Sequence, residues 1–72
     1  MTANKVIKVI GSNVRKLRLK AKLSLRGLAN RAQISNSCLI EVEKGNGNPL
    51  ISTLHKITKS LNTNIFSLFK EI

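Results

Sequence analysis

The stretch from Leu23 to Gly45 constrains this chain more than any other, because it has the pattern of two short capped helices joined by a tight turn. Ser24 and Ser35 are good helix N-caps, and each is followed by apolar residues at helical spacing. A hydrophobic residue precedes each cap and another follows five positions later, which is the spacing of a hydrophobic staple. The two pairs are Leu23 with Leu28 and Ile34 with Leu39. The pattern therefore predicts one helix over about residues 24–32 and a second over about residues 35–44.

The second of these helices has an outer face suited to reading DNA. Its inner face holds Leu39 and Val42, and at about 100° per residue the opposite face holds Ser37, Ile40, Glu41 and Lys44. Two helices joined in this way outline a helix-turn-helix, whose second helix enters the major groove. In its first turn Asn36 can bond adenine bidentately, and further along Ile40 suits a thymine methyl group. The candidate base-reading residues are therefore Asn36, Ser37, Ile40 and Glu41, with an ordinary solvated helix face as the alternative.

The charge of the chain favours a polyanionic partner. Thirteen Lys and Arg residues against three Glu residues give a net charge of +10, which is more than solubility requires. The only aromatic residues are Phe66 and Phe69, so the chain has few side chains on which single-stranded bases could stack. We therefore expect double-stranded DNA as the partner. On the reading face, Glu41 either accepts a hydrogen bond from a cytosine amino group or repels phosphates at wrong sites.

The remaining segments have the patterns of scaffold helices around one small core. Apolar residues at helical spacing in the first part of the chain are Ile7, Ile10, Val14, Leu17 and Ala21. Gly11 interrupts this stripe, so we expect the regular helix to begin near Ile10 and residues 1–9 to be frayed or to form an added turn. Closing helices are expected over about residues 51–61 and 64–70.

As a set, these residues resemble the Cro and phage-repressor type of helix-turn-helix domain, often called the XRE family. The positions in register are Arg18, Leu23, Ser24, Leu28, Ala29, Ser35, Leu39, Val42, Glu43, Gly45, Pro49, Leu54, Leu61 and Leu68. The match runs from about Ile10 to Phe69 and is specific as a set. It implies that residues 1–72 form a single all-α domain, a compact five-helix bundle of the lambda-repressor-like type. Helices 2 and 3 of that bundle form the helix-turn-helix.

The resemblance also implies roles for individual residues. Glu43 points toward the edge of the inner face, where a desolvated carboxylate needs a partner, and in this family that partner is the helix 1 arginine, here Arg18. Contacts to DNA phosphates are expected from Ser24, Arg26, Lys44 and Asn46. The chain departs from the family at Leu25, where a Gln often contacts phosphate. It also departs at Gln33, where Gly is usual and another residue costs roughly 1–2 kcal/mol in the left-handed region.

The function that the resemblance implies is sequence-specific transcription regulation, as a repressor of a phage, mobile-element or operon promoter. Such domains often read two half-sites about 34 Å apart with a two-fold dimer, so a homodimer is expected. Phe66 and Ile72 are the candidate dimer contacts, and a peripheral core position is the alternative for Phe66. The same chain suits a DNA-binding antitoxin with a toxin partner, or the controller of a restriction-modification system. No small-molecule effector is evident.

Other classes of protein receive less support. One His, one Cys and no Asp supply neither an acid–base pair nor a metal site, so we expect no enzyme and no cofactor. His55 is expected at the surface of the helix over about residues 51–61, and Cys38 is expected as a small packed side chain. Without a signal sequence or a membrane-length apolar run, a cytoplasmic protein of a bacterium or phage is expected. A charge-driven nucleic-acid-coating protein and a cationic amphipathic protein acting at membranes remain the alternatives.

Overall fold

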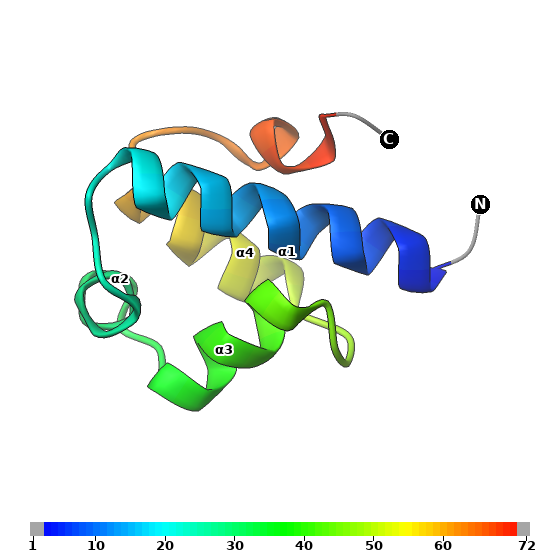
Figure 1. Ribbon diagram of the computed structural model, residues 1–72, viewed down its shortest axis with the longest axis horizontal. Coiled ribbons are helices and arrows are strands. Elements are labelled where there is room, and N and C mark those ends of the chain that lie inside the picture. The colour runs from blue at the N-terminus through cyan, green and yellow to red at the C-terminus, as the bar shows by residue number, and fades with distance from the viewer. Residues whose placement is uncertain (1–2, 71–72) are drawn as a thin grey trace.

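The chain forms four α-helices and a short 3-10 helix in a computed structural model that describes residues 3–70 (Figure 1). In chain order the elements are α1 (Ala3–Lys20), α2 (Leu25–Ala32), α3 (Asn36–Lys44), α4 (Ile51–Ser60) and η1 (Ile65–Phe69). The long helix α1 has η1 on one side and α3 on the other, and α2 packs against both α3 and α4 (Figure 1). This arrangement leaves the outer face of α3 at the edge of the molecule farthest from η1.

The core draws on all five elements. Its buried apolar residues are Ile10, Val14, Leu28, Ala29, Ala32, Leu39, Val42, Leu54, Ile57 and Leu68. The small side chains of Ala29 and Ala32 face inward on α2 and let α3 and α4 pack closely on it. Leu23 and Ile34, which precede the two helix caps, are half-buried and pack against the same core. Ala21, in contrast, lies beyond the end of α1 and is exposed.

Helix α1 begins earlier than the sequence pattern indicates, because Gly11 does not interrupt it. Gly11 is buried, and a Cβ atom added there would lie 2.2 Å from the carbonyl oxygen of Val42 and 3.0 Å from that of Glu43. The glycine therefore lets the backbones of α1 and α3 approach each other. Its cost within a helix, about 0.5–1 kcal/mol relative to Ala, is offset by this packing.

The fifth element corrects the expectation of a five-helix bundle, since residues Ile65–Phe69 form a 3-10 helix rather than an α-helix. Asn64 caps the element by accepting a hydrogen bond from the Phe66 amide at 3.0 Å. Beyond it, the side-chain amide of Asn13 on α1 donates to the carbonyls of Leu68 at 2.7 Å and Lys70 at 3.2 Å. These bonds hold residues 68 and 70 against α1, and Lys70 has an extended backbone.

Local hydrogen bonds set the start of α2, the start of α3 and the turn between the two helices. The Ser24 hydroxyl accepts from the Gly27 amide at 2.9 Å, and the Ser35 hydroxyl accepts from the Cys38 amide at 3.0 Å. Between the two caps Gln33 adopts the left-handed conformation, with φ 59° and ψ 44°. The following amide, that of Ile34, donates back to the Ala29 carbonyl at 3.0 Å, which closes α2 in the manner of a Schellman turn.

Candidate nucleic-acid interface

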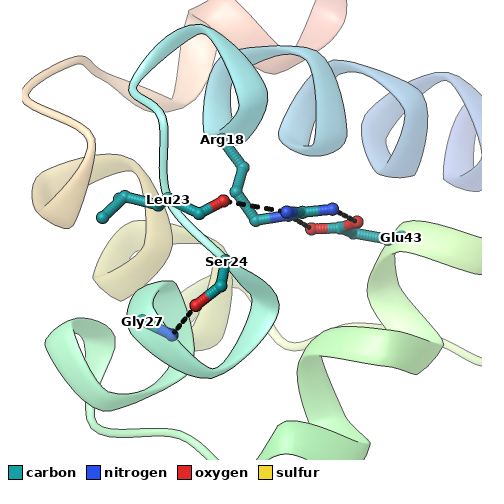
Figure 2. A network of polar contacts seen from close by, with 5 residues as sticks. All are labelled: Arg18, Leu23, Ser24, Gly27 and Glu43. Atoms are coloured by element: carbon teal, nitrogen blue, oxygen red, sulfur yellow. Dashed lines mark hydrogen bonds and ion pairs between the residues drawn. The ribbon is translucent and has the colours of Figure 1, made fainter.

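A buried ion pair joins α1 to α3 behind the outer face (Figure 2). The Arg18 guanidinium donates from Nε to one carboxylate oxygen of Glu43 at 2.7 Å and from Nη2 to the other at 3.1 Å. Its Nη1 donates to the Leu23 carbonyl at 2.9 Å, in the turn that leads into α2 (Figure 2). The two charged side chains are 10% and 9% exposed. Because three segments meet at one planar group, the pair fixes the position of α3 relative to α1 and to the start of α2.

The outer face of α3 is polar and exposed along most of its length. Asn36 and Ser37 are exposed in the first turn, and Glu41 and Lys44 are exposed further along the helix. Ile40 differs, because its side chain is half-buried on the flank of α3 that faces the start of α2. The candidate base-reading residues therefore lie on a single surface, with the apolar one at its edge.

On the opposite flank of α3, the structure brings Glu41 and Asn46 together. The side-chain amide of Asn46 donates to a carboxylate oxygen of Glu41 at 3.0 Å, and both residues are exposed. This bond ties the loop after α3 to the reading face and orients the Glu41 carboxylate. The Asn46 amide that the sequence assigned to a phosphate is thus engaged with Glu41.

The other candidate phosphate ligands lie at both ends of the helix pair. Ser24 caps the N-terminus of α2, where backbone N–H groups without intrahelical partners favour a phosphate oxygen. Arg26 is exposed at the second position of α2, and Lys44 is exposed at the C-terminal end of α3. Exposed cationic side chains therefore lie at the start of α2 and at the end of α3, near the candidate base-reading residues.

Sequence reasoning missed a hollow beside the reading face, which we call the Leu25–Ile40 hollow. It has a volume of about 270 Å³ and is lined by Arg15, Arg18, Leu25, Ile40, Glu43 and Lys44. Leu25, the first residue of α2, is half-buried and packs partly on the core. Arg15 lies about one turn before Arg18 on the same side of α1, a spacing that was visible in the sequence.

The candidate dimer contact Phe66 is 78% exposed, whereas Ile72 lies outside the described residues. Phe66 adjoins Ile65, which lines a second hollow of about 740 Å³ between α4 and η1. Ile51 on the rim of that hollow is 66% exposed. Large apolar side chains thus gather on the side of the molecule formed by α4 and η1.

Two other kinds of site, a metal centre and a membrane span, are not found in the described part of the chain. Between residues 3 and 70 there is no group of three or more His, Cys, Asp and Glu side chains that could hold a metal ion. Nor does any helix in that range have the length and apolarity needed to cross a membrane. His55 is exposed on α4, and Cys38 is half-buried beside the loop after α3.

Two capped helices, the second with an exposed polar face and a buried ion pair behind it, define a helix-turn-helix domain of the DNA-binding class. Residues 14–68 match a family model described as Helix-turn-helix. The chain belongs to this family of Cro and phage-repressor type domains. A search of curated proteins gave no match.

Several solved structures are similar to this fold. The restriction-modification controller protein C.AhdI from Aeromonas hydrophila matches with a TM-score of 0.84 and 27% identity, over 88% of this chain and 96% of that one. An HTH_3 family transcriptional regulator from Vibrio cholerae matches with a TM-score of 0.88 and 29% identity, over 94% of this chain but 38% of that longer one. A hypothetical transcription factor, NHTF, from Neisseria matches with a TM-score of 0.86 and 20% identity, over 96% of this chain and 79% of that one. At that identity the last match supports the fold alone.

Proposed function

We propose that this protein binds double-stranded DNA in a sequence-specific way and regulates transcription, with the outer face of α3 reading bases in the major groove. The observation that carries the proposal is the exposed face of Asn36, Ser37 and Glu41 on a helix held by the buried Arg18–Glu43 pair. Base reading needs side chains whose positions are set before binding, because each good bidentate contact depends on geometry. Asn36 is matched to adenine and Glu41 to the amino group of cytosine.

Phosphate contacts position the domain on its site. Ser24 and Arg26 at the start of α2 and Lys44 at the end of α3 contact backbone phosphates. The net charge of +10 adds an affinity that is independent of sequence and falls as salt rises. This charge speeds the search for the site, while the α3 face selects it.

The active form is a homodimer that uses the apolar side formed by α4 and η1. An aromatic side chain as exposed as Phe66, next to the hollow that Ile51 and Ile65 line, is typical of an interface centre. Sedimentation of the parent and of Phe66→Ser tests this contact. The parent is expected to show a concentration-dependent dimer and the variant a monomer, and a parent that stays monomeric at high concentration contradicts the proposal.

The similarity to C.AhdI favours one biological setting, control of a restriction-modification operon, over the broader setting of a phage or mobile-element repressor. That match covers 88% of this chain and 96% of C.AhdI. The genes that neighbour the one encoding this chain distinguish the two. Control of restriction genes predicts that the neighbouring genes encode a nuclease and a methyltransferase, and an antitoxin role predicts a neighbouring toxin gene.

Selection of bound duplexes from a random DNA pool at about 0.15 M salt, near physiological ionic strength, tests the proposed function. The selected duplex and a scrambled duplex are then titrated side by side. An inverted repeat bound about 1,000-fold or more tightly than the scramble is expected, since specific binders reach this range. A pool without an enriched motif, with affinity that collapses on added salt, indicates a charge-driven coating protein instead.

A further inference from the structure

The Leu25–Ile40 hollow presents two apolar side chains where a DNA-binding surface is otherwise polar. Leu25 comes from the first position of α2 and Ile40 from the middle of α3, so the hollow exists only when the two helices are packed together. Ile40 is half-buried but lies outside the core cluster and the residues packed on it. Its apolar surface is therefore not explained by folding.

The charges around the hollow restrict what can occupy it. Arg18 and Glu43 neutralise each other in their ion pair, which leaves Arg15 and Lys44 as the cations on the rim. A polyanion that carries an exposed apolar group matches both the apolar side chains and the cations of the hollow. In the major groove of DNA the apolar group on a base edge is the C5-methyl of thymine.

We propose that the Leu25–Ile40 hollow receives the C5-methyl group of one thymine in each half-site, while Arg15 and Lys44 contact the phosphates beside it. The inference rests on the proposed function and deepens it, because it assigns a base preference to a pair of side chains from two helices. Leu25 thereby gains a role as a specificity residue at a position where the family often has a polar phosphate contact.

A thymine-to-deoxyuridine scan of the selected duplex tests this directly, since it removes one methyl group and leaves every hydrogen-bonding group in place. For the unaltered protein, deoxyuridine at one thymine of each half-site is expected to weaken binding about fourfold per half-site, the effect of one buried methyl-sized group. Placing 5-methylcytosine at that position, paired with guanine, separates a methyl contact from reading of the whole base pair. The methylated duplex is expected to bind more tightly than its unmethylated cytosine counterpart.

Variants assign the methyl effect to the hollow. Ile40→Ala, outside the core, is expected to bind the thymine and deoxyuridine duplexes equally, and Leu25→Ala the same if circular dichroism shows it folded. Leu19→Ala, which truncates an exposed leucine of α1 that does not line the hollow, should keep the parent's preference. The proposal is overturned if no thymine in the site changes affinity by more than about twofold. It is likewise overturned by a half-site without thymine, or by a preference that survives in Ile40→Ala. Failure of the proposed function looks different, because then no motif is enriched at all.

Discussion

Replacing Glu43 by Ala removes one partner of the buried ion pair and leaves the other in place. Arg18 then keeps its bond to the Leu23 carbonyl at 2.9 Å but loses both bonds to the carboxylate. With Arg18 only 8% exposed, water from the adjoining Leu25–Ile40 hollow replaces the lost carboxylate oxygens only in part. The variant therefore contains an uncompensated buried charge at the place where three segments meet.

The expected loss can be compared with the whole stability of the domain. Breaking a buried pair on one side costs about 3–5 kcal/mol. At about 0.05–0.15 kcal/mol per residue, 72 residues have a total stability of about 4–11 kcal/mol. Glu43→Ala is therefore expected to lose about a quarter of the free energy of unfolding or more, and to be largely unfolded if the parent lies at the low end of that range.

Urea unfolding followed by far-UV circular dichroism measures this loss, and two controls show its origin. Glu43→Gln keeps one acceptor oxygen for Arg18, so it should lose less than Glu43→Ala. The double variant Arg18→Met/Glu43→Leu removes both charges, and its stability should recover toward that of the parent because no charge is left unpaired. A Glu43→Ala protein within about 1 kcal/mol of the parent would refute the reasoning, since exposed pairs cost no more than that.

Further predictions concern three other contacts of the fold. Gly11→Ala places a Cβ against the Val42 carbonyl oxygen and should lower the free energy of unfolding by about 3 kcal/mol. As a control, Gly27→Ala in α2 should stay within about 1 kcal/mol of the parent, because the nearest atom there is a serine hydroxyl oxygen at 3.1 Å. Equal losses of the two variants in urea titrations would contradict the account. Gln33→Gly should raise stability by about 1 kcal/mol because φ is 59° there, and an unchanged or lower melting temperature would count against strain in the turn. Asn13→Ala should cost about 1–3 kcal/mol and speed amide exchange in η1, and unchanged exchange would show that Leu68 packing alone holds this element.

The helix-turn-helix was predictable because its determinants are local. Ser24 and Ser35 make the capping bonds that their positions indicate, and α2 and α3 begin directly after them. Gln33 adopts the left-handed conformation for which the family usually has Gly. Each of these features depends on residues within one or two turns of the same segment, so the sequence pattern contains the necessary information.

Features that depend on tertiary contacts were not predictable. Gly11 has the same local signature whether it ends a helix or lies under another backbone, and only the position of α3 distinguishes the two cases. At the last element, Asn13, far away in the sequence, donates to the carbonyls of Leu68 and Lys70, a contact that no local pattern contains. Likewise, the Leu25–Ile40 hollow is formed by residues of three helices, and no single helix pattern contains it.

The central claim is that the α3 face selects the DNA sequence, while the surrounding cations only hold the duplex. The ratio of two dissociation constants tests this claim most directly. The Kd for the selected duplex and the Kd for its scramble are measured for the parent, for Asn36→Ala/Ser37→Ala and for Arg26→Ala. The account predicts that the double variant loses about tenfold or more of the ratio, whereas Arg26→Ala weakens both duplexes alike and keeps the ratio. A ratio unchanged in Asn36→Ala/Ser37→Ala would contradict base reading by this face.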